Sequence, residues 1–145
     1  MEYIETAIKG VFIIEPRVFS DSRGYFMETW KQAEFDERIG HVQFIQDNES
    51  KSSYGVLRGL HYQKGEASQA KLVRVIKGKV IDVAVDLRKS SPTFGQHVMV
   101  ELSEDNKRQK YCCLRRSSFP STVVSSGYRT PQISSACRRC SMTAA

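Results

Sequence analysis

The chain has 145 residues, which is enough for one domain with a hydrophobic core and too few for two of ordinary size. It contains no apolar run of membrane-spanning length, and its N-terminal residues lack the basic flank and apolar block of a signal peptide, so a cytoplasmic protein is expected. The net charge of +6 would ordinarily suggest a polyanionic partner, but residues 1–105 hold 14 Lys and Arg against all 16 Asp and Glu, so the positive excess belongs to residues 106–145 and no nucleic-acid partner is expected.

Up to residue 105 the sequence predicts a series of short strands separated by turns. The strand-like segments are rich in β-branched and aromatic residues. Residues 31–40 are the only helical candidate. Phe35 and Ile39 lie one helical turn apart there, and Gly40 is placed to end the helix. The predicted strands lie within residues 10–19, 24–30, 41–48, 55–63, 71–88 and 96–102.

Short strands with regular turns predict an all-β sandwich or barrel, because too little helix is present for a βαβ sheet. Residues 71–88 are expected to form two strands joined at Gly78. In the second of these, apolar residues alternate with Asp82, Ala84 and Asp86, a period of two. Since an antiparallel sandwich buries one face of each sheet, Asp82 and Asp86 are expected to face water.

The last part of the chain departs from this pattern. Residues 110–145 contain all four cysteines, no acidic residue and no sustained alternation, so they are expected to be irregular and to pack poorly. Cys137 and Cys140 have the spacing of zinc ligands, but Cys112 and Cys113 are adjacent, which does not suit a structural zinc site. Nothing in the sequence indicates secretion, so a disulfide framework is not expected either.

Several polar residues lie within strand-like sequence, and as a group they suggest a chemistry. Alone, each has an ordinary interpretation as a solvated turn residue or as a polar residue at a sheet edge. Together, arginines suit contacts with phosphate, a histidine suits general-base catalysis, and a lysine beside a carbonyl oxygen stabilises an enolate. This combination fits proton abstraction next to a carbonyl group of a phosphorylated substrate. The residues are Arg23, Glu28, Gln46, Asp47, Asn48, Arg58, His61 and Lys71.

A metal site at His61 is not expected. Small cupin-type barrels commonly bind a metal ion through two histidines separated by one residue on a strand, because both then face the same side. The corresponding position here is Gln63, and His41 and His97 lie in other contexts. No set of three or four ligands with suitable spacing is found in residues 1–109.

Four segments resemble the dTDP-4-dehydrorhamnose 3,5-epimerase family: DSRGYFMETW, QFIQDNESKSSYGVLRGLHYQ, QAKLVRVIKGKVIDVAVDLRKSSPTFGQ and VELSEDNKRQ. The resemblance covers residues 1–109. It implies a cupin-like jelly roll that assembles as a homodimer and needs no metal or organic cofactor. The implied reaction is the epimerisation of dTDP-4-dehydro-6-deoxy-D-glucose at C3 and C5, through enolate intermediates, in dTDP-L-rhamnose biosynthesis.

The resemblance also implies roles for the polar residues. His61 corresponds to the catalytic base, and Lys71 corresponds to the lysine that contacts the sugar carbonyl. Arg23 and Arg58 correspond to residues that bind the pyrophosphate. Because Arg58 and His61 would lie on opposite faces of a regular strand, a bulge at Gly59 is expected to turn both into one cavity. The nucleotide-contacting positions, some of which serve the neighbouring subunit in the family, correspond to Glu28, Gln46, Asp47 and Asn48.

The resemblance ends after residue 109. The family's tyrosine acid, the aspartate that orients its base and a phosphate-binding histidine have no counterpart in residues 110–145, and a change of reading frame near Gln109 would explain this. The chain therefore divides into an incomplete epimerase domain, residues 1–109, and an atypical basic tail in which the family's last strands are missing or replaced. As written, it is expected to lack turnover. Two alternatives stay open: a related sugar-nucleotide cupin, such as a 3-epimerase or ketoisomerase, and a non-catalytic nucleotide-sugar binding remnant.

Overall fold

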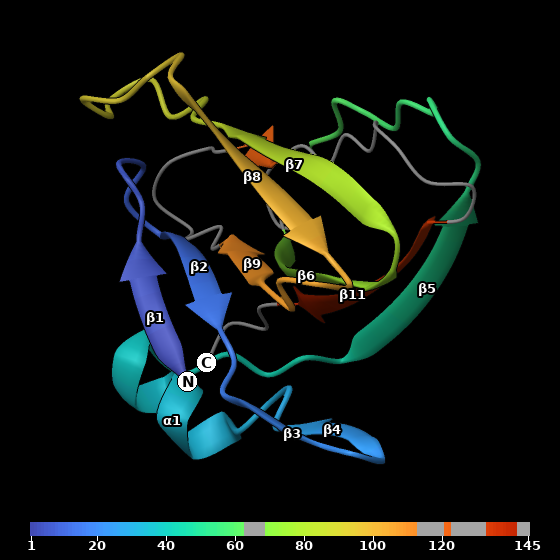
Figure 1. Cartoon of the computed structure of the whole chain (residues 1–145). Helices are drawn as coiled ribbons and strands as arrows, with labels where there is room; N and C mark the ends of the chain where they lie inside the picture. Colours follow the sequence, from blue (N-terminus) through green and yellow to red (C-terminus); the bar gives the residue numbers. More distant parts are fainter. Residues whose placement is uncertain (63–68, 113–120, 123–132, 142–145) are drawn as a thin grey trace.

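The computed structural model describes residues 1–62, 69–112, 121–122 and 133–141, and these form eleven strands and one short helix (Figure 1). None of the described residues form a helix that is long and apolar enough to cross a membrane. In chain order the elements are β1 Glu2–Glu5, β2 Val11–Glu15, β3 Val18–Asp21, β4 Gly24–Met27, α1 Gln32–Arg38, β5 Gln46–Ser52, β6 Gln69–Lys77, β7 Lys79–Val85, β8 His97–Ser103, β9 Gln109–Cys112, β10 Ser121–Thr122 and β11 Ile133–Ser141.

The strands form two antiparallel sheets and a separate hairpin. One sheet has six strands in the order β1-β2-β9-β6-β11-β5, the other has three in the order β10-β7-β8, and β3 pairs with β4. An apolar layer joins the two sheets, with Val73 and Val75 from β6, Val80 from β7, and Val100 and Leu102 from β8. The chain is therefore a β-sandwich, as the succession of short strands predicts.

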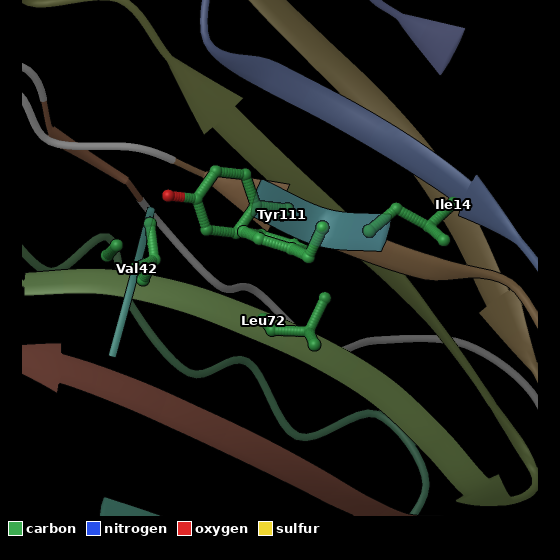
Figure 2. Close-up of a cluster of buried hydrophobic side chains, with 6 residues drawn as sticks. Ile14, Val42, Leu72 and Tyr111 are labelled. Atoms are coloured by element: carbon green, nitrogen blue, oxygen red, sulfur yellow. The ribbon is translucent and has the colours of Figure 1, made fainter. Parts of the chain in front are cut away.

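A second apolar layer covers the other side of the six-stranded sheet, where helix α1 packs (Figure 2). Phe35 of α1 is fully buried, and its ring centroid lies 4.5 Å from that of Trp30 and 4.8 Å from that of Tyr111 on β9. Ile39 caps the helix, and Gly40 follows at a φ of +119°. The predicted helix and its terminal glycine are confirmed.

Most of the predicted strands are present. Residues 71–88 contain most of β6 and all of β7, and Gly78 makes the turn between them at a φ of +78°, which glycine adopts without steric cost. The strand predicted within residues 41–48 starts only at Gln46, where β5 begins.

The strand predicted within residues 55–63 is absent from the part of this segment that the structure describes. Residues 55–62 form no strand, and all but one of their side chains are exposed. Gly55 and Gly59 have φ values of +78° and +117°, which interrupt extended backbone at two points. The expected bulged strand at Gly59 is therefore wrong, and this segment is a loop.

The prediction that Asp82 and Asp86 face water is also wrong. Asp82 lies on the inner face of β7 and is 0% exposed, and Asp86 lies just beyond the end of this strand and is 1% exposed. Their apolar neighbours on the outer face, such as Ile81 and Val83, are half-buried. A period of two identifies the two faces of a strand but not the face that becomes covered. Here the polar face is covered, and each carboxylate has a cationic partner that offsets part of the cost of burial.

Parts of the tail form strands, so the expectation that residues 110–145 are irregular is wrong for these parts. β9 crosses the expected boundary at residue 109, lies between β2 and β6, and has all four residues buried. β11 pairs with β5 and β6, and β10 pairs with β7. Backbone hydrogen bonds to neighbouring strands make these pairings, and they need no hydrophobic alternation. Cys112 is a buried free thiol, whereas Cys113 and the side chains of Cys137 and Cys140 lie outside the described part of the chain.

Candidate active site

The strand register brings three of the predicted site residues to one face of the six-stranded sheet. Residues that pair across antiparallel strands point to the same side of a sheet. Lys71 of β6 and Gln46 of β5 both pair with position 139 of the intervening β11, while Val73 and Asn48 both pair with position 137. Val73 belongs to the apolar layer between the sheets. Lys71, Gln46 and Asn48 therefore lie on the inner face, where Lys71 and Asn48 are half-buried and Gln46, near the edge, is exposed. These three residues are called the interior site.

The amides of the interior site offer a hydrogen-bond donor to a ligand. Gln46 Nε2 donates to Asn48 Oδ1 over 3.1 Å. The Nδ2 of Asn48 is buried, and no described residue accepts a hydrogen bond from it. A buried donor without a protein acceptor is satisfied when a ligand supplies one. Asp47, between the two in sequence, lies on the opposite face of the strand and is exposed.

A buried ion pair lies in the same interior. Asp82 Oδ2 on β7 is 2.7 Å from Lys110 Nζ on β9, and both side chains are 0% exposed. Burial raises the pKa of Asp82, while the positive charges of Lys110 and then of Lys71 act in the opposite direction. Lys71 therefore belongs to a group of three interacting charges inside the sandwich.

Sequence reasoning missed both members of this ion pair. Asp82 is visible in the sequence as a polar residue on an alternating strand, but alternation alone assigns it to the wrong face. Lys110 carries no comparable signal, because it lies in a segment without alternation. Its inward orientation follows from the pairing of β9 with β6, where Lys110 is opposite Val73.

Arg58 attaches the loop that carries His61 to the end of β5. Arg58 Nε donates to Ser52 Oγ over 2.7 Å, and its Nη2 donates to the carbonyl oxygen of Lys51 over 3.2 Å. His61 follows three residues later and is exposed. Within the described residues, no hydrogen bond or ion pair joins the predicted base, His61, to the predicted enolate-stabilising group, Lys71.

Arg23 and Glu28 lie away from the interior site, on and next to the β3–β4 hairpin. Arg23 is at the tip of the hairpin, its side chain is 88% exposed, and its Nη2 lies 2.6 Å from Asp21 Oδ2. Glu28 follows β4 and is also exposed. Figure 1 shows the hairpin at the lower edge of the molecule and the loop of residues 53–62, in green, at the upper right. A single copy of the chain therefore does not bring Arg23 to the loop that carries Arg58 and His61.

The described residues offer no cluster suited to a metal ion. No group of three or more His, Cys, Asp or Glu residues among them is arranged to hold one. Gln63, the position that would pair with His61 in a cupin metal site, lies outside the described residues.

Comparison with known sequences identifies relatives of this chain. The family model of dTDP-4-dehydrorhamnose 3,5-epimerase matches residues 5–114. The dTDP-4-dehydrorhamnose 3,5-epimerase of Salmonella typhimurium is 60% identical over 110 residues, which make up 75% of this chain and 60% of the relative. The chain thus spans about 60% of the length of the curated relatives it matches.

Solved structures agree with this result. The dTDP-4-dehydrorhamnose 3,5-epimerase of Elizabethkingia anophelis is 46% identical with a TM-score of 0.81, and the match covers 99% of this chain and 76% of that one. The dTDP-6-deoxy-D-glucose-3,5-epimerase of Legionella pneumophila, solved in complex with dTDP-4-keto-L-rhamnose, is 41% identical with a TM-score of 0.80, covering 99% and 73%. These likenesses confirm the predicted all-β, cupin-like jelly roll. With a family model that matches most of its length, the chain belongs to the dTDP-4-dehydrorhamnose 3,5-epimerase family.

Proposed function

We propose that the protein is a dTDP-4-dehydrorhamnose 3,5-epimerase that acts on dTDP-4-dehydro-6-deoxy-D-glucose in dTDP-L-rhamnose biosynthesis, without a metal or organic cofactor. The observation that carries this proposal is the interior site, where Lys71 lies on the same face of the sheet as two amide side chains two strands away, in a chain that belongs to this family. The Legionella relative, solved with dTDP-4-keto-L-rhamnose, supports the substrate class.

Lys71 is proposed to stabilise the enolate. Removing a proton from the carbon beside a ketone leaves negative charge that moves onto the ketone oxygen. A fixed ammonium group stabilises that charge most effectively where water is excluded, and Lys71 is half-buried between the two sheets. The lysine therefore acts when charge develops in the transition state, and it contributes to the rate as well as to binding.

His61 is proposed to be the base that removes the proton. A neutral imidazole accepts a proton near physiological pH, which no other side chain on this loop does. Inversion at each carbon also requires that a proton returns from the opposite face of the sugar ring. The family's tyrosine acid, which would return it, has no counterpart in residues 110–145, so the chain as written is expected to exchange protons through His61 without net turnover. The nucleotide is proposed to contact Gln46, Asn48 and the exposed Asp47. Arg58 is proposed to bind the pyrophosphate.

The protein is proposed to work as a homodimer in which the β3–β4 hairpin of one copy completes the site of the other. The hairpin carries Arg23, and Glu28 follows it. It also exposes large apolar side chains, since Phe19 is 50%, Tyr25 55% and Phe26 71% exposed. Exposed apolar side chains gathered on a projecting element are typical of a surface that a partner covers. In a two-fold dimer each site would then combine Arg58 of its own chain with Arg23 of the partner.

Deuterium exchange into the keto-sugar tests the proposed reaction. The protein is incubated in D₂O with dTDP-4-dehydro-6-deoxy-D-glucose, and deuterium at C3 and C5 is measured by NMR. We expect exchange at both carbons. His61→Asn should retain dTDP binding and lose exchange by about a hundredfold or more, the usual contribution of a general base. His97→Asn, an exposed histidine on β8, is the matched control and should exchange normally.

The pattern of exchange also separates the alternatives. Exchange at one carbon, or a ketone that has moved, would replace the proposal with a related 3-epimerase or ketoisomerase. Binding of dTDP without exchange at either carbon would replace it with a nucleotide-sugar binding role. Normal exchange in His61→Asn would remove His61 as the base.

Complementation between two variants tests the proposed dimer. Arg23→Ala and Arg58→Ala should each weaken dTDP binding by about 2 kcal/mol, the loss expected for a charge-assisted contact. In a mixed dimer, one site receives both mutations and the other receives neither. Mixing the variants should therefore restore tight binding at about a quarter of all sites if the subunits exchange freely. Mixed samples that bind no better than their components would contradict the shared site.

The cytoplasmic location remains a prediction. Cell fractionation that recovers the protein with membranes would contradict it.

A further inference from the structure

Two lysines face one aspartate in the interior of the sandwich. On β6 and β9, Lys71 pairs with Cys112 and Val73 pairs with Lys110. Lys71 and Lys110 are therefore diagonal neighbours on the same face, with Cα atoms about 7–8 Å apart in such an arrangement. Asp82, on the facing strand β7, approaches Lys110 to 2.7 Å. One carboxylate thus contacts one ammonium group, that of Lys110, while the charge of Lys71 acts on it from farther away.

By register, β11 contributes one further charged residue to this face, Arg139, which pairs with Lys71. Val100 pairs with Asp82 on β8, and Ile13 pairs with Lys110 on β2, and both are apolar. On the β5 side, the interior site contributes only the uncharged amides of Gln46 and Asn48. The positive charge of Lys71 nevertheless acts on Asp82 across the interior, after the larger effect of Lys110. Because Asp82 and Lys110 are 0% exposed, water screens the charges that act on Asp82 less than it does at the surface.

We propose that Asp82 is a positioning residue for Lys71, and that Lys110 competes with Lys71 for its carboxylate. The closest partner of Asp82 is Lys110, so only part of its negative charge acts on Lys71. When Lys110 is absent, Asp82 holds the Lys71 ammonium group in a fixed position. When Asp82 is absent, Lys71 loses its fixed orientation. That this orientation serves an enolate rests on the proposed function, whereas the competition between the two lysines does not.

The alternative to this proposal is that Asp82 and Lys110 form an ion pair with a structural role only. In that case Asp82 has no effect on the position of Lys71. The two arrangements differ in how the amine of Lys71 responds when Asp82 is removed. Asp82→Asn alone is a poor probe, because it leaves Lys110 buried without a partner and endangers the fold. Lys110→Met removes that difficulty, since methionine has a similar length and no charge.

The experiment compares Lys110→Met with the double variant Lys110→Met/Asp82→Asn in the full chain. An amine-acylating reagent is added at one fixed pH, and the rate of acylation at Lys71 is measured by peptide mass spectrometry. Lys31 and Lys9, both exposed, serve as internal references within the same samples. The reagent reacts only with an amine that is uncharged and free to move. A carboxylate that pairs with the ammonium group lowers the fraction of time that the amine spends in this reactive state. Removing Asp82 should therefore raise the Lys71 rate about tenfold, the effect of losing one opposite charge nearby, and leave the reference rates unchanged.

A third variant and a second readout complete the test. Lys110→Met/Asp82→Glu keeps the carboxylate and should return the Lys71 rate toward that of Lys110→Met. Equal Lys71 rates in all three variants, with unchanged circular dichroism, would overturn the proposal. Because labelling uses no sugar, its outcome is independent of whether the chain is an epimerase.

If deuterium exchange does occur, Asp82→Asn in the Lys110→Met background should slow it while dTDP binding is retained. An unchanged exchange rate would contradict the positioning role of Asp82.

Discussion

Replacing Asp86 tests how far one buried carboxylate stabilises this fold. Asp86 lies just beyond β7, and its side chain is 0% exposed. Its two carboxylate oxygens accept hydrogen bonds from Arg88 Nε and Nη2 at 2.8 and 2.7 Å, from Ser91 Oγ at 2.6 Å and from Thr93 Oγ1 at 2.6 Å. The backbone of Asp86 also bonds to Gln96 and Gly95. The carboxylate therefore organises the whole β7–β8 loop.

Asp86→Asn keeps the shape of the side chain but removes its charge and turns one acceptor into a donor. Hydrogen bonds to a charged group contribute about 1.5–3 kcal/mol each, and bonds that share one carboxylate are not additive. The free energy of unfolding should therefore fall by about 3–4 kcal/mol at pH 7, roughly the effect of two such bonds. Urea unfolding followed by circular dichroism measures this difference.

The loss should also depend on pH in a defined way. Burial alone would raise the pKa of Asp86, but hydrogen bonds from Arg88, Ser91 and Thr93 outweigh it and hold the pKa well below the ordinary value of 3.8. A lowered folded-state pKa means that the stabilisation is complete above the unfolded pKa and is lost as the pH falls toward the folded one. The difference between parent and variant should thus be constant from pH 7 to about pH 5 and shrink below about pH 4.

A matched control separates burial from pairing. Asp21 makes a similar contact, 2.6 Å from Arg23 Nη2, but both side chains are exposed. Asp21→Asn should therefore leave the unfolding midpoint unchanged, because exposed pairs are screened by water. The reasoning fails if Asp86→Asn is no more costly than Asp21→Asn, or if its cost is independent of pH.

Three further outcomes are expected. Phe35→Ala should lower the free energy of unfolding by about 3–5 kcal/mol, since it empties the centre of the apolar layer under α1; a loss below about 1 kcal/mol in urea unfolding would contradict the tight packing of this layer. Asp82→Asn should lower the free energy of unfolding by about 3–5 kcal/mol because it leaves Lys110 buried and unpaired, whereas Lys110→Met should lower it less because Lys71 can then pair with the carboxylate. The double variant should be about as stable as the parent, and equal losses of stability in the two single variants would contradict this prediction. Treatment with EDTA should leave the melting temperature and any exchange activity unchanged, and a stoichiometric metal found in the purified protein by elemental analysis would show the prediction to be wrong.

The elements predicted correctly are those whose signal is local. Helix α1 follows from the spacing of Phe35 and Ile39, and β6 and β7 follow from two apolar runs around Gly78. The apolar side chains of residues 55–62 resemble those of a strand, but positive φ values at Gly55 and Gly59 interrupt the extended backbone, so the segment is a loop.

Features that depend on distant partners could not be derived from local patterns. The inward face of Asp82 depends on Lys110, which comes 28 positions later and sits on a strand of the opposite sheet. β11 lacks alternation and is a strand because it pairs between β5 and β6. The motifs identified Lys71, Gln46 and Asn48 as candidate site residues, but only the register through β11 puts them on one face.

The position of β9 has a consequence for the order in which this protein can fold during synthesis. β9 is the only described strand that connects β2, near the N-terminus, to β6. The N-terminal strands therefore emerge from the ribosome without the neighbour that incorporates them into the large sheet, and they stay unprotected until residues 109–112 have been made. Contacts between residues so far apart in sequence make folding slow. Strand edges and apolar side chains remain exposed during that interval, which gives molecular chaperones a nascent chain to bind before any native sandwich exists.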